Sequence, residues 1–232
     1  MERDDQSRLM VALDVATREE ALSLADRVGR HVSHFKVGSR LFTSEGPDLV
    51  RTLKRAGYGV FLDLKYHDIP NTVAETAAAA AALGVDFFDV HASGGSGMMR
   101  AAVEASRDEA ARIGARRPRV LAVTVLTSMP STVEQVLALA EMARDAGVDG
   151  VVSSAWEARA VRDAMGEGFV IVTPGIRGPA PQGAPADDQA RTLGASAALA
   201  AGASYLVVGR PIIAAADPRA AALRIAEEAA PR

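Results

Sequence analysis

Eight short runs of β-branched and aromatic residues recur along the chain, and longer stretches rich in Ala, Leu, Arg and Glu separate them. The runs are apolar nearly throughout, which is typical of strands buried on both faces of a parallel sheet. The stretches between them space their apolar residues as a helix does; in residues 17–32, for example, Leu22, Leu24, Ala25 and Val28 lie on a broad apolar face. The eight runs cover residues 9–15, 34–38, 59–65, 87–92, 120–126, 150–154, 170–175 and 205–210.

Local signals mark where several of the helices begin and end. Thr17 followed by Glu20 predicts a capping box at the start of the first helix. Four glycines stand just after a helical stretch and just before a strand, where a helix usually meets its C-terminal cap. These glycines are Gly57, Gly84, Gly147 and Gly202.

This alternation predicts an α/β protein, and eight β-then-α units in 232 residues fit a (β/α)₈ TIM barrel. No linker or low-complexity segment interrupts the chain, so we expect a single barrel domain over residues 1–232. An open doubly wound sheet is the alternative. The absence of a G-x-G-x-x-G motif in the first turn counts against a dinucleotide-binding version of it.

Composition narrows the classes of function. A net charge of −3 gives no indication of nucleic acid or an acidic membrane as a partner. The chain has no cysteine, which excludes disulfides, thiol catalysis and cysteine-bound metal. The beginning of the sequence shows no secretory signal, and the longest apolar tract is broken by Gly84 and Asp86. We therefore expect a soluble cytoplasmic protein, and no histidine spacing favours zinc.

Polar residues stand at the ends of nearly all the predicted strands. In a barrel of this class, the chemistry gathers where the strands end, on the C-terminal face. The strand ends carry Asp14, Lys36, Asp63 with Lys65, His91, Thr127 with Ser128, Ser153 with Ser154, Pro174-Gly175 and Gly209-Arg210. For His91, a supporting role is favoured over a catalytic one.

The third strand runs into FLDLKYHDIPNT, residues 61–72, where acids and bases alternate. Asp63 and Lys65 are two residues apart, so in a strand both point to the same side. Lys36 ends the neighbouring strand, and Asp68 follows after a short turn. Such a set provides fixed charges that stabilise a transition state, and a lysine between acids can donate a proton to a carbanion. The alternative is a surface cluster of ion pairs of little energetic value.

The last two strand ends indicate a phosphate site. The loops after strands seven and eight of such barrels often bind phosphate, and Arg210 in VVGRPI stands at that point. Residues 173–191 form the longest irregular stretch and are rich in Gly and Pro, as a lid or binding loop would be. Within it, Gln182 and Gln189 could offer an amide to a ligand, and Arg177 a positive charge.

Several motifs, in the same order along the whole chain, resemble those of the orotidine 5′-phosphate decarboxylase family. DLKYHDIPNT at residues 63–72 carries most of the resemblance. The other matching motifs are ALDV (12–15), FKVG (35–38), VHASGG (90–95), VTVLTS (123–128), VTPGIR (172–177) and VVGRPI (207–212).

The resemblance implies a homodimeric lyase of de novo pyrimidine biosynthesis that converts orotidine 5′-monophosphate to UMP and CO₂ without a metal or organic cofactor. In this interpretation Lys65 gives the proton to C6 of the pyrimidine, and Asp63 stands against the substrate's carboxylate. Lys36 belongs to the same charge network and also touches the ribose. Asp68, Ile69 and Thr72 would reach into the site of the neighbouring subunit.

The resemblance also assigns residues to the rest of the substrate. Asp14 would bind the ribose hydroxyls, and Thr127 the pyrimidine ring, with Ser128 as an alternative. The lid and phosphate contacts would come from Arg177, Gln189, Gly209 and Arg210, with Gln182 an alternative to Gln189.

Two other functions remain open at this point. One is a related barrel that acts on a sugar phosphate through Mg²⁺ and an enediolate. The lysine of FKVG and the IPNT tail favour the orotidylate interpretation over this one. The other is a barrel without catalytic activity that only binds nucleotides or acts as a scaffold for a partner.

Overall fold

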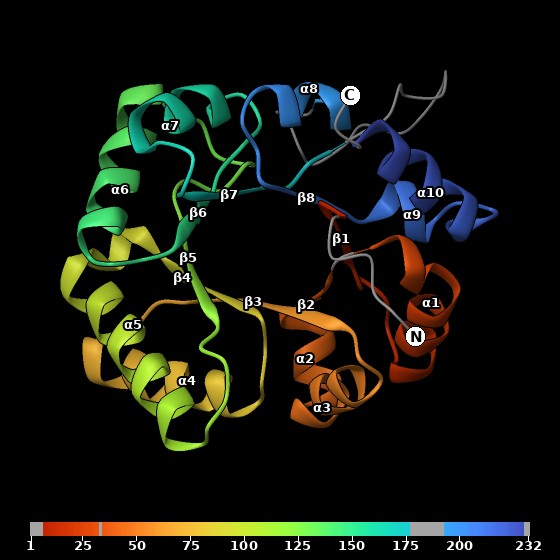
Figure 1. The fold of residues 1–232 in the computed structure, drawn as a ribbon, viewed down its shortest axis with the longest axis horizontal. Coiled ribbons are helices and arrows are strands. Elements are labelled where there is room, and N and C mark those ends of the chain that lie inside the picture. Colours follow the sequence, from red (N-terminus) through yellow and green to blue (C-terminus); the bar gives the residue numbers. More distant parts are fainter. Residues whose placement is uncertain (1–6, 33, 177–192, 230–232) are drawn as a thin grey trace.

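The computed structural model describes residues 7–32, 34–176 and 193–229, and its eight strands close into a barrel (Figure 1). All neighbouring strands are parallel and follow in sequence order, and β8 pairs with β1, as in the register Met10 to Val207. The predicted barrel is therefore confirmed and the open sheet is wrong. The strands are β1 Leu9–Ala12, β2 His34–Gly38, β3 Gly59–Tyr66, β4 Phe87–His91, β5 Arg119–Val123, β6 Gly150–Val152, β7 Val170–Thr173 and β8 Tyr205–Val208.

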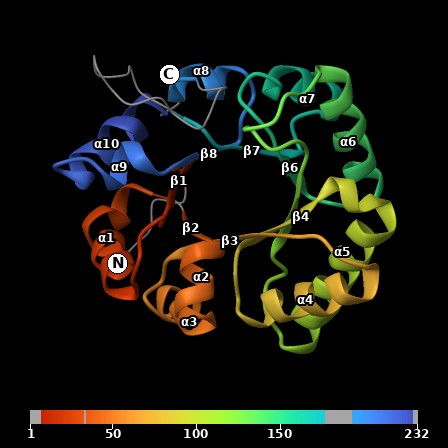
Figure 2. The same ribbon diagram turned by 180° about the vertical axis from the view of Figure 1, so that it is seen from behind.

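Helices surround the barrel on its outside, as both views show (Figures 1 and 2). The longer ones are α1 Arg18–Val28, α3 Pro47–Arg55, α4 Pro70–Ala82, α5 Gly95–Arg112, α6 Val133–Asp145, α7 Ala158–Met165 and α10 Pro218–Glu228. Shorter α-helices are α2 Ser39–Glu45, α8 Ala195–Ala200 and α9 Arg210–Ile213, and 3₁₀ turns are η1 Gly29–His31 and η2 Ala92–Gly94.

The predicted helix boundaries are confirmed. The Thr17 hydroxyl accepts the backbone N–H of Glu20 at 3.3 Å, and the Glu20 carboxylate reaches back to the N–H of Thr17 at 3.4 Å. The four predicted glycines all have positive φ, and each stands two residues beyond the end of a helix. Glycine adopts this left-handed backbone without strain, so these positions end the helices and turn the chain toward the next strand.

The core has two layers because the side chains of a strand point alternately inward and outward. Phe61 and Phe87 point into the barrel, where Met10, Leu121 and Val207 also pack. Val60 and Leu62, on either side of Phe61, belong to the larger layer between the strands and the helices. The strands are therefore buried on both faces, which explains their apolar composition.

Three partly buried acceptors fix the N-terminal ends of alternate strands. Asp86, just before β4, accepts the N–H of Val60 at 2.8 Å and the Lys54 ammonium at 2.6 Å. Asp149, before β6, accepts the N–H of Val120 at 2.8 Å and pairs with Arg117. Ser204 does the same for β7 by accepting the N–H of Ile171 at 3.1 Å. In each case a residue that opens one strand holds the strand before it, so this end of the barrel is built for stability.

None of the helices in the described part of the chain is both long enough and apolar enough to cross a bilayer.

Candidate active site

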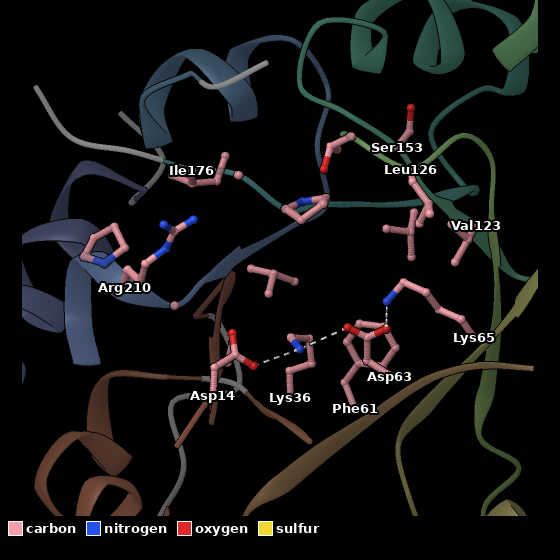
Figure 3. A pocket seen from close by; sticks show the side chains of 18 of the residues that line it. Asp14, Lys36, Phe61, Asp63, Lys65, Val123, Leu126, Ser153, Ile176 and Arg210 are labelled. Atoms are coloured by element: carbon pink, nitrogen blue, oxygen red, sulfur yellow. Dashed lines mark hydrogen bonds and ion pairs between the residues drawn. The ribbon is translucent and has the colours of Figure 1, made fainter. Parts of the chain in front are cut away.

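A cavity of about 420 Å³ opens at the C-terminal ends of the strands, which is a usual size for a small-molecule site (Figure 3). Side chains from several strands converge on it. Phe61 and Val207 form part of its floor, and Pro174, Gly175 and Ile176 contribute to its wall after β7. The cavity is thus the mouth of the barrel above its apolar interior.

A bulge in β3 sets the direction of Lys65. Between Leu62 and Tyr66, β3 advances by four residues while its partner β4 advances by two, from Phe88 to Val90. Among the residues that the structure describes, Lys65 is the only non-glycine residue with a positive φ, at 52°. This left-handed conformation costs roughly 1–2 kcal/mol, and such bulges commonly re-aim a side chain beside an active site.

Four charged side chains form a continuous chain across the cavity (Figure 3). The Lys36 ammonium lies 3.4 Å from Oδ1 of Asp14 and 3.0 Å from Oδ2 of Asp63. The other oxygen of Asp63 accepts a hydrogen bond from the Lys65 ammonium. The side chains of Lys36 and Asp63 are each 12% exposed, so these charges are largely screened from water by protein. Three members of the predicted alternation, Lys36, Asp63 and Lys65, therefore meet in the cavity, and Asp14 extends the chain where Asp68 was expected.

The contacts keep Lys36 and Asp63 ionised. Burial by itself would lower the pKa of Lys36, but the charges of Asp63 and Asp14 outweigh it and raise the pKa above its ordinary value. Burial would raise the pKa of Asp63, yet the two neighbouring ammonium groups bring it well below its usual range. Both groups are therefore charged at neutral pH and need no rearrangement to present those charges.

A fifth ionisable residue, Asp89 in β4, lies beneath this chain. It is fully buried, and its Oδ1 accepts the backbone N–H of Lys65 at 2.8 Å. The carboxyl group of Asp63 is close enough for its negative charge to act on Asp89. Burial and the nearby charge of Asp63 raise the pKa of Asp89 well above its ordinary value.

The structure brings seven of the predicted site residues to the cavity. They are Asp14, Lys36, Asp63, Lys65, Thr127, Gly209 and Arg210. In Figure 3, Arg210 and Lys65 lie toward opposite ends of the cavity. Ser128, the alternative to Thr127, is exposed and does not line the cavity. A substrate held between Arg210 and Lys65 would therefore meet Thr127 before Ser128.

The remaining predicted residues do not line this cavity. Asp68, Ile69 and Thr72 lie in the turn before α4 and in its first residues, and all three are exposed to solvent. Ile69 is 66% exposed, which is high for an apolar residue of this size. Arg177, Gln189 and Gln182 fall outside the described residues.

Sequence reasoning missed two polar residues near the cavity. Asp89 interrupts the apolar run FFDVHA, and an acid inside a buried strand was the available signal. Ser153 was noted only as a polar strand end. It is 1% exposed, lines the cavity, and its hydroxyl has no hydrogen-bond partner in the described part of the chain.

The histidines stand beside the charged chain without entering it. The rings of His91 and His67 have their centroids 5.3 Å apart. Burial and the nearby His67 and Lys65 lower the pKa of His91, so it is neutral at pH 7. Neither histidine lines the cavity, and the supporting role of His91 stays a prediction.

The donors of the site differ from those of a typical metal centre. Among residues 7–32, 34–176 and 193–229, no group of three or more His, Asp or Glu side chains is placed to hold a metal ion. Around Asp63, the nearest charged groups are two ammonium groups that already occupy both carboxylate oxygens.

Comparison with known proteins gives a consistent result. A sequence model described as "Orotidine 5'-phosphate decarboxylase / HUMPS family" matches residues 7–225. An orotidine 5′-phosphate decarboxylase of Moorella thermoacetica is 48% identical over 235 residues, with 96% of this chain and 92% of that protein covered. One from Alkalilimnicola ehrlichii is 50% identical, with 97% of each covered.

Solved structures agree with these matches. A crystal structure of orotidine 5′-phosphate decarboxylase from Lactobacillus acidophilus has a TM-score of 0.84 to this chain at 39% sequence identity. The match covers 97% of this chain and 99% of that one. The similarity therefore extends over the entire barrel.

Proposed function

Because the chain belongs to the orotidine 5′-phosphate decarboxylase / HUMPS family, we propose that it converts orotidine 5′-monophosphate to UMP and CO₂. The observation that carries this proposal is the chain of ion pairs from Asp14 through Lys36 and Asp63 to Lys65 inside the cavity. It supplies both a fixed anion and a proton donor at one place, which a decarboxylation through a carbanion requires.

In this mechanism the bond between C6 and the substrate's carboxylate breaks, and its electron pair stays on C6. CO₂ leaves, and the Lys65 ammonium transfers a proton to C6 to give UMP. The neutral amine then takes a proton back from water. Asp63 stands next to the departing carboxylate, so the repulsion between them is relieved as CO₂ forms, while the Lys65 ammonium stabilises the negative charge that develops on C6.

The other parts of the substrate hold it in place. Arg210 would bind the phosphate, Asp14 and Lys36 the ribose, and Thr127 the pyrimidine ring, with Gly209 leaving room beside Asp14. A β-carbon at position 209 would lie 3.3 Å from Oδ2 of Asp14, so a larger residue would crowd the ribose ligand. Binding at the phosphate, far from C6, can provide the energy that keeps the reacting carboxylate against Asp63.

An assay with purified protein tests the proposal. We expect orotidine 5′-monophosphate to lose its orotate absorbance and to yield UMP and CO₂, at an unchanged rate in excess EDTA. Loss of activity in EDTA together with turnover of a sugar phosphate would support the metal-dependent alternative. Binding of UMP without any turnover would support a barrel that only binds nucleotides.

We also propose that the active unit is a homodimer whose subunits complete each other's site. Asp68, Ile69 and Thr72 support this, because in one chain they are exposed and lie outside the cavity lining, although they belong to the motif that provides Asp63 and Lys65. An isoleucine that is 66% exposed is more favourably placed in an interface. Asp68 would then enter the partner's cavity as the second carboxylate of the charge network.

Three broader statements rest on the same function. We infer that residues 1–232 are one domain, since strands from both ends of the chain complete a single barrel. The product, UMP, places the reaction in pyrimidine nucleotide synthesis. A pathway of small soluble intermediates fits a cytoplasmic enzyme.

A further inference from the structure

The buried carboxyl group of Asp89 has no role in the mechanism above. Asp89 is 0% exposed and stands in β4 two residues after Phe87, which points into the barrel interior. By strand alternation Asp89 points into the barrel as well, directly under the charged chain. A buried acid without a cation of its own is costly unless it loses its charge or is fully hydrogen-bonded.

The hydrogen bonds of Asp89 show how this is resolved. Its Oδ1 accepts the N–H of Lys65 at 2.8 Å. Its Oδ2 is buried and receives no hydrogen bond from any N–H or O–H group in the described part of the chain. Asp63, the inward-pointing acid of the neighbouring strand β3, is close enough for its negative charge to act on Asp89. A buried carboxylate oxygen that has no donor and faces a second carboxylate is costly, and a proton shared by the pair removes this cost.

The surroundings decide which of the two carries it. Asp63 meets two ammonium groups, those of Lys36 and Lys65, one on each of its oxygens. Asp89 accepts the backbone N–H of Lys65, and the negative charge of Asp63 acts on it more strongly than the positive charge of the Lys65 ammonium. The other ionisable groups on this side are Tyr66 of β3 and His91 of β4, and on β5 the residue paired with Asp89 is the apolar Leu121. The proton therefore resides on Asp89.

We propose that Asp89 is a positioning residue, held as a neutral carboxylic acid, which donates its proton in a hydrogen bond to Asp63 and accepts the N–H of Lys65. One side chain then fixes both members of the reacting pair. It holds the Asp63 carboxylate in place, and it satisfies the backbone of Lys65 at the left-handed residue of the β3 bulge. This inference rests on the proposed decarboxylation only for its catalytic consequence.

The neutrality of Asp89 has a chemical purpose. A second carboxylate in this position would attract the Lys65 ammonium away from C6 and add a buried negative charge below Asp63. A neutral acid instead leaves the positive charge of Lys65 available to the developing carbanion. The raised pKa of Asp89 agrees with this protonation state.

Asp89→Asn is the informative substitution, because the amide is always neutral and can still donate to Asp63 and accept from Lys65. We expect kcat to stay within about tenfold of the wild type. Asp89→Val removes both hydrogen bonds, and we expect kcat to fall by roughly 10²-fold or more, with KM changing far less. Equal and severe losses in the two variants would overturn the proposal.

The pH dependence of stability tests the proton directly and needs no catalytic activity. Above about pH 4 the unfolded chain ionises this aspartate while the native protein keeps it protonated. The contribution of Asp89 to the free energy of unfolding of the wild type therefore falls as pH rises, whereas the amide in Asp89→Asn contributes no such pH dependence. Between pH 4.5 and 7 we expect the unfolding equilibrium constant of the wild type to rise, relative to Asp89→Asn, by up to about tenfold per pH unit.

Asp86→Asn is the matched control, since Asp86 is a partly buried acid next to the same strand. Burial would raise the pKa of Asp86, but its bonds to Lys54 and to the N–H of Val60 lower it, so it is ionised in both states above about pH 5. The difference in the free energy of unfolding between Asp86→Asn and the wild type should therefore not change with pH in that range. If the difference between Asp89→Asn and the wild type is also independent of pH, Asp89 is ionised in the native protein and the inference is refuted.

Infrared spectroscopy offers an independent reading. The wild type at neutral pH should show the carbonyl band of a protonated carboxylic acid, and the band should be missing from Asp89→Asn but present in Asp86→Asn. Absence of the band from the wild type would contradict a neutral Asp89, whatever reaction the enzyme catalyses.

Discussion

At the scale of single residues, the site works by opposing two environments for the same type of side chain. Asp63 stands between two ammonium groups and stays ionised, whereas for Asp89, one strand away, burial and the negative charge of Asp63 outweigh the charge of Lys65. The Lys36 ammonium contacts Oδ2 of Asp63, and the negative charges of Asp63 and Asp14 keep it protonated. The charges are therefore preset before the substrate enters, and a reaction that develops charge at C6 needs little reorganisation of the protein.

Lys65→Ala tests the assignment of the proton donor. Removal of a positioned general acid typically lowers the rate by about 10²–10⁴-fold, and here it also removes the cation that faces C6. We expect kcat to fall by at least that factor, while UMP still binds through the distant Arg210. Absorbance assays and UMP titrations measure the two effects.

Lys54→Ala is the matched control for that experiment. Lys54 is also a partly buried lysine paired with an aspartate, Asp86, but it stands at the opposite end of the barrel. It should lower stability and leave kcat near that of the wild type. Decarboxylation by Lys65→Ala within about tenfold of the wild type would remove Lys65 from the mechanism.

At the scale of elements, β3 has two different ends with two different tasks. Its N-terminal end is regular, and Asp86 ties the N–H of Val60 to the next strand. Its C-terminal end is bulged, so the regular hydrogen bonds between β3 and β4 are interrupted there. The backbone N–H of Lys65 donates to the Asp89 side chain instead. The strand is thus anchored where the barrel needs stability and distorted where it aims Lys65, the proton donor of the proposed mechanism, into the cavity.

The short strand β6 gives a prediction about packing between elements. A β-carbon on Gly150 would lie 2.1 Å from the carbonyl oxygen of Val170 in β7, so Gly150→Ala forces these paired strands apart. We expect a loss of about 1–3 kcal/mol in the free energy of unfolding, measured by urea denaturation. Gly168→Ala serves as the control, since a β-carbon there meets nothing within 4 Å, and it should change stability by less than about 0.5 kcal/mol. If Gly150→Ala leaves the free energy of unfolding unchanged, β6 and β7 can move apart without cost.

At the scale of the whole molecule, the barrel brings residues from both ends of the chain to one cavity. Asp14 follows β1, Arg210 follows β8, and the pairing of these two strands makes them neighbours across the closure of the sheet. The outer surface near α4 carries the exposed Asp68, Ile69 and Thr72, which a second copy of the chain would cover in the proposed dimer.

Mixing two inactive variants tests the shared site. If Asp68 acts in the partner's cavity, a heterodimer of Lys65→Ala and Asp68→Asn has one intact site and one site with both changes. Random exchange makes half of the dimers mixed, so up to roughly a quarter of wild-type activity should return. Size-exclusion chromatography and differently tagged subunits establish that mixed dimers form.

A second mixture provides the control. Lys65→Ala with Lys36→Ala places both changes in the same cavity lining, so neither site of a heterodimer is intact and no activity should return. Equal results in the two mixtures would argue that each subunit has a complete site of its own.

Much of this architecture was readable from local sequence. The eight strands appear within a few residues of their predicted bounds, because a strand buried on both faces must be apolar and its flanking helices must be amphipathic. The glycines and the Thr17 capping box fixed several helix ends for equally local reasons. The strand-end rule then led to Lys36, Asp63 and Lys65 before their contacts were known.

Other features escaped the sequence for identifiable reasons. The expectation that Asp63 and Lys65 share a side assumed a regular strand, whereas Lys65 reaches Asp63 from a bulge with a left-handed backbone. Asp89 went unnoticed because its role depends on burial beside Asp63, and strand periodicity does not report which acid gains a cation. Arg177 and Gln189 stay predictions, since they fall outside the described residues.

The order of strands and helices and the types of residue at the strand ends were determined by the sequence alone, since periodicity and side-chain chemistry are local properties. Closure of β8 on β1, the aim of Lys65 and the protonation of Asp89 were decided by the tertiary structure. Each of these depends on groups far apart in the chain that only folding brings within hydrogen-bonding distance, in surroundings where burial changes the energy of a charge.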